Sequence, residues 1–235
     1  MTSPIFAFFD PTYILVIAGL LLSMAASGYV NSTYAKYDRY RAQSGVTGTA
    51  AAQYILQQSG INNVSVHPIA GNLTDNYNGS NKTLNLSEST ANSSSVAAVG
   101  VAAHECGHAV QDARNYFPMR LRTAIVPVAN LGSTLSFPLI LVGVLMGMNQ
   151  TLIHIGILLF SLALLFQLVT LPVEFNASHR ALRILSDGGL LTANEVPMVR
   201  RVLTAAALTY VAAALATFLQ LLRLILLFGG NRDDN

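Results

Sequence analysis

Charged residues and cysteine are both scarce in this chain. Lys, Arg, Asp and Glu together make up 10% of its 235 residues, whereas hydrophobic residues make up 52%. That balance is too apolar for an ordinary soluble domain of this length, and it indicates an integral membrane protein. Cys106 is the only cysteine, so an intrachain disulfide is excluded.

Lysine and arginine are absent from the first ten residues, MTSPIFAFFD, which therefore lack the basic start of a cleaved signal peptide. A membrane span needs roughly 20 apolar residues. Four segments are long enough, at about 12–30, 124–148, 151–172 and 202–228. We therefore expect the first segment to be a retained anchor and the chain to be a multi-pass protein of the cell membrane.

The few basic residues are distributed unevenly around these four segments. Eleven of the 13 Lys and Arg residues lie between the first and second segments or between the third and fourth, and the exceptions are Arg223 and Arg232. Short basic loops stay in the cytoplasm. We therefore expect both termini outside the cell and an insert of about residues 31–123 in the cytoplasm.

This insert combines helical and strand patterns. Residues 45–60 predict a short helix, with Thr47 as a candidate N-cap and Gly60 as its end. Residues 61–88 predict two or three short strands, including a hairpin whose second strand is KTLNLS. In residues 89–115, several Ser and Asn residues are candidate N-caps before a long helix of small residues. The insert is small for a core of its own, so we expect it to lean on the membrane helices.

We find no internal repeat and no linker long enough to separate two domains. The expected fold class is therefore a mainly α membrane protein, with about four transmembrane helices and a small α+β cytoplasmic insert. We expect residues 1–235 to form a single membrane-embedded domain.

The segment VAAHECGHAV places His104 and His108 four residues apart, with Glu105 directly after the first histidine. On a helix, positions i and i+4 share a face, so both imidazoles can reach one metal ion. In such helices the glutamate acts as the base that activates a zinc-bound water. The pattern has only three fixed positions and also arises by chance, but a histidine pair in an alanine-rich helix has little use for packing alone.

Two histidines need a further donor on the same side of the membrane, and Glu174 is the candidate. It lies two residues past the third apolar segment, at its expected cytoplasmic end. A carboxylate inside a span is costly, which favours a role for one at its edge. The alternative is an interfacial acid neutralised by Arg180 or Arg183.

The segments HECGH and EFNAS together resemble the gluzincins, zinc peptidases with two histidines on one helix and a glutamate from a later helix. A closer resemblance covers nearly the whole chain. The segments SGVTG, LTDNY, SVAAVGVAAHECGHAVQD, FQLVTLPVEFNASHRAL and LTAAALTYVAAAL are similar to the YugP-like family of bacterial, membrane-bound neutral zinc metallopeptidases. The resemblance implies a zincin-like insert, one zinc ion per chain and peptidase activity, and it leaves the substrate open.

Membrane-bound gluzincins of the HtpX group carry an aspartate four residues after this glutamate, where it supports a histidine ligand through a hydrogen bond. This chain has Ser178 at that position, so the sequence leaves open which residue supports the histidine. Asp112, four residues after His108, is a candidate substitute.

Three weaker candidates surround the motif. His179 is either an oxyanion-stabilising residue or a solvated helix histidine, and Tyr77 is a candidate donor to a tetrahedral intermediate. The strand KTLNLS resembles the edge strand on which gluzincins hold an extended substrate through backbone hydrogen bonds.

The expected function is a membrane-bound zinc endopeptidase that hydrolyses peptide bonds at the cytoplasmic membrane surface. The alternative is a non-catalytic, zinc-stabilised scaffold or adaptor for other membrane proteins, although such a scaffold has no need for Glu105. The expected partners are a polypeptide substrate, with membrane proteins among the candidates, and the lipid bilayer. We expect no nucleic-acid partner. The sequence leaves open whether the chain acts as an oligomer or with a regulatory membrane partner.

Overall fold

The computed structural model of the chain describes residues 10–229. The first nine residues and Arg232 lie outside this range, so the expected location of both termini stays a prediction. The described residues form two compact units. The helical unit contains residues 10–26, 121–169 and 209–229, and the sheet unit contains residues 27–120 and 170–208.

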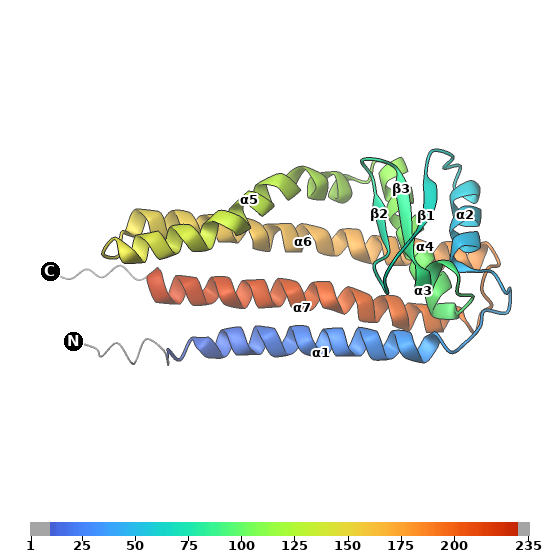
Figure 1. Ribbon diagram of the computed structural model, residues 1–235, viewed down its shortest axis with the longest axis horizontal. Coiled ribbons are helices and arrows are strands. Elements are labelled where there is room, and N and C mark those ends of the chain that lie inside the picture. The colour runs from blue at the N-terminus through green and yellow to red at the C-terminus, as the bar shows by residue number, and fades with distance from the viewer. Residues whose placement is uncertain (1–9, 230–235) are drawn as a thin grey trace. The chain divides into compact units, whose positions relative to one another are not determined.

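Four long helices account for most of the chain (Figure 1). They are α1 (Tyr13–Tyr37), α5 (Phe117–Leu145), α6 (Gln150–Asp187) and α7 (Val196–Phe228). Each is long and apolar enough to cross a membrane, and each contains one of the four expected spans. Each helix also continues beyond its apolar segment, so that one end of every long helix belongs to the sheet unit.

The outer faces of these helices expose large apolar side chains. Ile14 is 69% exposed, Leu158 66% and Leu131 59%. Soluble proteins rarely leave large contiguous apolar patches in water. The exposed side chains are therefore consistent with a surface that lipid covers.

Inside the helical unit, glycines allow the backbones of α5 and α6 to approach closely. A Cβ atom on Gly132 would lie 2.6 Å from the backbone oxygen of Leu159, and one on Gly156 would lie 2.8 Å from that of Ser136. Small residues at such contacts are typical of helix packing in membranes, where van der Waals contact drives association.

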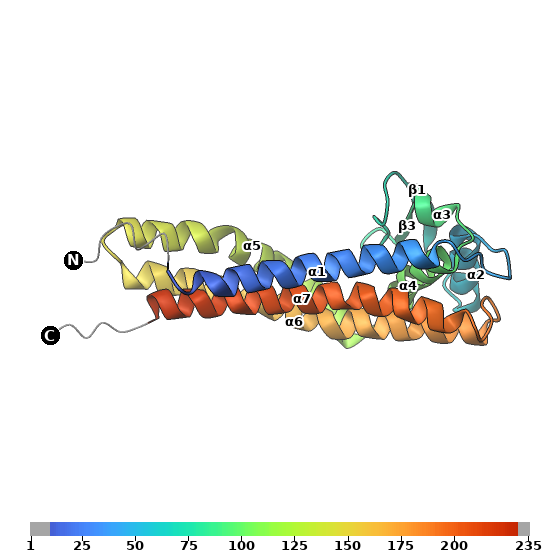
Figure 2. The same ribbon diagram turned by 90° about the horizontal axis from the view of Figure 1, so that it is seen from below.

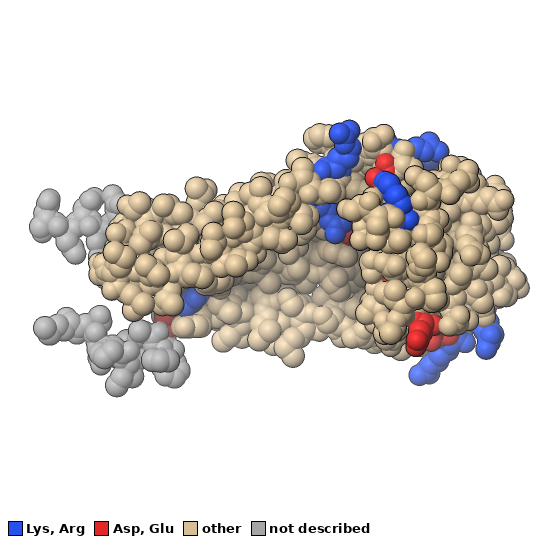
Figure 3. Space-filling model, turned by 45° about the horizontal axis from the view of Figure 1, so that its top comes forward, with Lys and Arg blue, Asp and Glu red and all other residues tan. Residues whose placement is uncertain are grey.

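Charge is divided unequally between the two units. The described part of the helical unit contains three charged residues, Asp10, Arg122 and Arg223, and all the other described charges belong to the sheet unit. The face in Figure 3 has the same contrast, since most of its charged side chains lie on the part that contains the sheet. In the helical unit, the guanidinium carbon of Arg223 lies 4.1 Å from the ring centroid of Tyr13.

The sheet unit contains three helices and three strands besides the ends of the long helices. They are α2 (Gly48–Gln58), β1 (Ser65–Ile69), β2 (Asn76–Asn78), β3 (Thr83–Ser87), α3 (Glu88–Ala91) and α4 (Val96–Ala113). Both Figure 1 and Figure 2 show α2, α3 and α4 next to the strands. The side chain of Thr47 accepts a hydrogen bond from the backbone N–H of Ala50, which confirms the predicted N-cap of α2.

The three strands form one sheet in the order β1-β3-β2. β2 pairs antiparallel with β3, with Asn78 opposite Thr83, which confirms the predicted hairpin. β1 pairs parallel with β3, with Ser65 opposite Thr83. The segment KTLNLS is therefore the central strand, and the expectation that it is an edge strand is wrong, because strands on both sides use its backbone groups. The edge strand β2 contacts α4.

Helix α4 is buried in the core of the sheet unit, where two of its glycines lie against other helices. A Cβ atom on Gly107 would lie 2.6 Å from the backbone oxygen of Ala177 in α6, and one on Gly100 would lie 2.7 Å from the side chain of Val199 in α7. A backbone oxygen cannot move aside as a side chain can. Gly107 therefore allows α6 to pass close to α4 directly beside the motif histidines.

Candidate metal centre

The helical geometry of α4 places His104 and His108 on one face. The helix begins at a capped end, where the hydroxyl of Ser95 accepts a hydrogen bond from the backbone N–H of Ala98 and donates one to Asp38. The two imidazole rings lie one turn apart, with centroids separated by 4.8 Å and planes at 85°. Both rings can therefore present a nitrogen to the same point.

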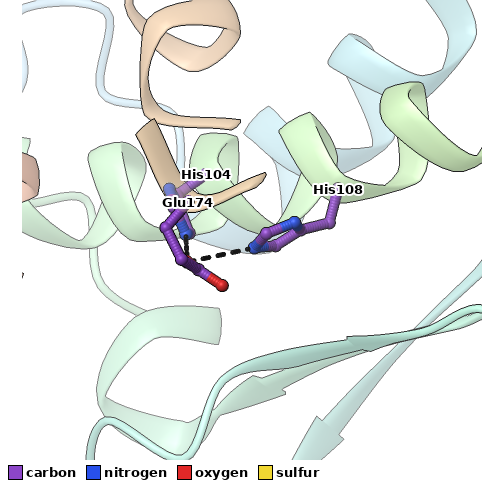
Figure 4. A group of neighbouring side chains, drawn as sticks. All are labelled: His104, His108 and Glu174. Carbon is purple, nitrogen blue, oxygen red and sulfur yellow. Dashed lines mark hydrogen bonds and ion pairs between the residues drawn. The ribbon is translucent and has the colours of Figure 1, made fainter. Parts of the chain in front are cut away.

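Glu174 reaches this point from α6. Its Oε2 atom lies 3.2 Å from Nε2 of His104 and 3.5 Å from Nε2 of His108. Figure 4 shows the carboxylate between the two rings, with one contact to each. Glu174 is only 2% exposed, so its carboxylate lies in the protein interior and not at the surface of the helix.

The donor set fits a zinc ion. One ligand atom from each of His104, His108 and Glu174 lies within 4.8 Å of the other two. Zinc binds imidazole nitrogen and carboxylate oxygen at about 2.0–2.2 Å in tetrahedral geometry, so neighbouring ligand atoms lie about 3.3–3.5 Å apart. The two nitrogen–oxygen distances, 3.2 and 3.5 Å, are close to this spacing. Three protein ligands leave the fourth position for water or substrate, as catalytic zinc sites require.

The other ring nitrogen of each histidine has its own partner. Nδ1 of His104 lies 3.2 Å from the hydroxyl of Ser178, and Nδ1 of His108 lies 3.0 Å from Oε1 of Gln111. Ser178, at the position where the HtpX group has aspartate, thus contacts a motif histidine. Such partners fix the orientation and the tautomer of a ligating imidazole.

The position of Gln111 determines the tautomer of His108. The Nε2 group of Gln111 donates hydrogen bonds to the backbone oxygen of Val173 at 2.8 Å and to Oδ1 of Asn176 at 3.0 Å. A carbonyl oxygen can only accept, so the amide nitrogen must face α6 and the amide oxygen must face His108. Nδ1 of His108 therefore carries the hydrogen, and the lone pair of Nε2 faces Glu174.

Gln111 is not among the site residues that the sequence predicts, and Asp112 is the candidate partner of a motif histidine. The carboxylate of Asp112 accepts hydrogen bonds from the hydroxyl of Tyr77 and from Nζ of Lys82, which tie α4 to the β2–β3 hairpin. Burial and the bond to Asp112 raise the pKa of Tyr77. The sequence feature that could have identified Gln111 is an amide side chain three residues after the second histidine, on the helix face that packs against α6.

Glu105 is buried beside the same cluster, with 8% of its surface exposed. Burial raises the pKa of its carboxyl group above the usual range, while the neighbouring imidazoles of His108 and His104 act in the opposite direction. Glu105 directly follows His104 and lies three residues before His108 on α4, so its carboxyl group projects from the same side of the helix as His108.

His179 lies outside the cluster of His104, His108 and Glu174. It is exposed on α6, and its Nε2 atom lies 3.3 Å from a guanidinium nitrogen of Arg183. The structure thus brings His104, His108 and Glu174 together, with Ser178 against His104 and Glu105 next to it on α4. Asp112 instead bonds to the β2–β3 hairpin, and His179 lies against Arg183.

Comparison with known proteins agrees with this geometry. Residues 12–229 match a protein family described as "Putative neutral zinc metallopeptidase". The chain is also 46% identical over 221 residues to "Putative membrane protease YugP" from Bacillus subtilis (strain 168), which covers 94% of this chain and 98% of that protein. The chain belongs to this metallopeptidase family. No solved structure matches the chain.

Membership of the metallopeptidase family implies zinc as the metal and a polypeptide as the substrate. The His104–His108–Glu174 cluster supplies suitable ligands for that ion. The similarity to a membrane protease and the four long apolar helices both indicate a membrane protein. The family thus agrees with the chemistry of the donor set and with the composition of the chain.

The role of Gln111 can be tested by removing its amide. We expect Gln111→Leu to lower zinc affinity by about 10–100-fold, the usual effect of losing the partner of a ligating histidine. Gln111→Glu keeps an acceptor for Nδ1 of His108, so we expect it to retain more of the affinity than Gln111→Leu. Competition with a chromophoric chelator measures the zinc affinity of both variants. The control is Gln57→Leu, at an exposed position of α2. Equal zinc affinity in wild type and a folded Gln111→Leu protein would contradict the role.

Proposed function

We propose that this chain is a membrane-bound zinc endopeptidase that hydrolyses peptide bonds at the cytoplasmic surface of the cell membrane. The observation that carries the proposal is the convergence of His104, His108 and Glu174, from two helices, with the buried Glu105 beside them. A purely structural zinc site tends to fill all four positions and has no use for such a glutamate. We further propose that the two units act together as one peptidase with one zinc ion per chain.

His104, His108 and Glu174 would hold the zinc ion, which when bound lowers the pKa of a water molecule and polarises the scissile carbonyl group. Gln111 and Ser178 keep the two imidazoles oriented through Nδ1. Glu105 accepts the proton of the attacking water at its carboxylate and then delivers it to the nitrogen of the leaving amine. The burial of Glu105 and Glu174 keeps bulk water away from both carboxylates.

The edge strand β2 is the proposed support for an extended substrate. It contacts α4, and its Tyr77 is hydrogen-bonded to Asp112 of that helix. A peptide that adds to a sheet edge gains main-chain hydrogen bonds, which are independent of its side chains. Binding of this kind would hold an unfolded segment beside the metal centre without requiring a particular sequence.

The proposed function is tested by incubating the zinc-loaded, detergent-purified protein with an unbiased peptide mixture and identifying products by mass spectrometry. We expect cleavage that stops when a chelator removes the metal and returns when zinc is added. A preparation that binds one zinc ion per chain and cleaves nothing in the mixture would favour the alternative, a zinc-stabilised scaffold for other membrane proteins.

The proposed orientation can be tested with single cysteines, because the native Cys106 is fully buried. We expect Gln150→Cys, at the first residue of α6, to react with a membrane-impermeant maleimide in intact cells. Ser80→Cys, in the exposed turn between β2 and β3, should react only after the cells are permeabilised. The reverse pattern would place the sheet unit outside the cell.

A further inference from the structure

A pocket with several basic lining residues lies in the sheet unit, and none of the three metal-ligand candidates lines it. It has a volume of about 450 Å³ and is formed by residues of α4 and α6 together with the end of α2. Its basic lining residues are Arg114, His179, Arg180 and Arg183, and its apolar ones include Val110 and Ile184. Pockets of 300–1,000 Å³ with a few convergent polar groups are typical of small-ligand sites.

No carboxylate lines this pocket, and within residues 10–229 none forms an ion pair with its three arginines. Elsewhere in the sheet unit a basic side chain does have such a partner, as in the pair of Lys82 with Asp112. Three guanidinium groups around one cavity repel each other, and charges of one sign are stabilised by a ligand of the opposite sign. The lining therefore points to an anion.

Two of the arginines are held in place before any ligand arrives. Nε of Arg180 donates a hydrogen bond to Oδ1 of Asn176 at 2.7 Å, and a terminal nitrogen of Arg183 lies 3.3 Å from Nε2 of His179. A guanidinium group has five N–H donors, so each arginine retains donors for a ligand. Preorganised donors lower the entropy cost of binding.

The ends of two helices reduce the positive charge of the pocket without cancelling it. Arg114 is the C-cap of α4, and Ser59 is the C-cap of α2. The C-terminus of a helix acts as roughly −0.5 charge, so two such ends contribute about −1. Three arginines therefore leave about +2, an excess that favours an anionic ligand.

We propose that this pocket binds the phosphate group of a phosphate-bearing ligand, through Arg114, Arg180 and Arg183. Arginine is suited to phosphate because its planar group donates two parallel hydrogen bonds to neighbouring oxygens. A single carboxylate would use fewer of these donors. The apolar side chains of Val110 and Ile184 provide contacts for the carbon atoms of a larger ligand.

An anionic phospholipid is the favoured source of this phosphate because of the place of the pocket along α6. The apolar segment of α6 ends near Pro172, and Asn176 to Arg183 follow four to eleven residues later, or about 6–16 Å along the axis. Side chains of a helix lean toward its N-terminus, here toward the apolar segment. Long arginine side chains can therefore reach the lipid headgroup layer, and basic pockets at the cytoplasmic ends of membrane helices bind anionic headgroups.

The test uses the full-length, zinc-loaded protein in neutral detergent. Short-chain phosphatidylglycerol is titrated into it, and native mass spectrometry measures the bound lipid at each concentration. We expect saturable binding of the lipid, and we expect inorganic phosphate to displace the bound lipid. The double variant Arg114→Gln/Arg183→Gln should bind it about tenfold or more weakly, since each lost arginine removes charge-assisted hydrogen bonds. The charge-matched control Arg39→Gln/Arg200→Gln removes two exposed arginines that do not line the pocket and should bind it normally.

The single charge reversal Arg183→Glu, at an exposed position, provides a second measure that leaves the other pocket residues intact. Zinc content and unfolding temperature check that each variant is folded. Phosphate binding that depends on the pocket arginines, without binding of the lipid, would assign the site to a soluble phosphate compound. Equal loss of binding in the double variant and the control pair, or no loss in either variant of the pocket, would overturn the proposal.

Discussion

We expect Glu105→Gln to lower peptide cleavage by at least about 100-fold while the protein still binds zinc. General acid–base catalysis contributes typically 10²–10⁴-fold, and an amide cannot accept a proton from the attacking water. Glutamine has nearly the same volume as glutamate, so the packing around this buried position should persist. Initial rates on a peptide identified in the cleavage screen, together with zinc content, measure both parts of the expectation.

The matched control is Glu88→Gln, which makes the same chemical change at an exposed position of α3. We expect it to cleave at the wild-type rate. Two results would contradict the role of Glu105. Turnover of Glu105→Gln within a few-fold of wild type would show that another group accepts the proton, and loss of zinc would show that Glu105 is itself a ligand.

Local features of the sequence predicted much of the fold because they depend on neighbouring residues only. The length of the apolar segments predicted the four long helices. The capping role of Thr47 at α2 followed from its place before a helical pattern, and the turn-rich segment before KTLNLS predicted the β2–β3 hairpin. The spacing of His104 and His108 likewise predicts a shared helix face from backbone geometry alone.

Features that depend on the packing of distant segments could not be predicted in the same way. The parallel pairing of β1 with β3 joins strands that are not adjacent in sequence, and it makes KTLNLS a central strand. The role of Gln111 depends on the backbone oxygen of Val173, more than sixty residues away, which fixes the direction of the amide. The spacing along the helix favours Asp112 equally, but the hairpin that binds its carboxylate is formed by another part of the chain.

We expect Glu174→Ala to remove most of the bound zinc and, with it, all detectable cleavage. The change leaves two protein ligands, and losing a direct ligand should cost more than the roughly 100-fold in affinity that follows the loss of an outer partner. Chelator competition measures the affinity, and dialysis followed by metal analysis measures the zinc that remains bound. Asp187→Ala is the control, because it removes an exposed acid from the same helix and should leave zinc binding unchanged.

Thermal unfolding distinguishes a lost ligand from a lost packing contact in this variant. Zinc that binds only the folded protein stabilises it by about 2.7 kcal/mol when its free concentration is 100 times the dissociation constant. The wild-type protein should therefore unfold at a higher temperature with zinc than with chelator, whereas Glu174→Ala should show little difference. A variant destabilised equally with and without zinc, and still zinc-bound, would show that Glu174 only joins α6 to the two histidines. If the variant loses only the zinc-dependent rise in unfolding temperature, the Glu174 carboxylate is the third ligand.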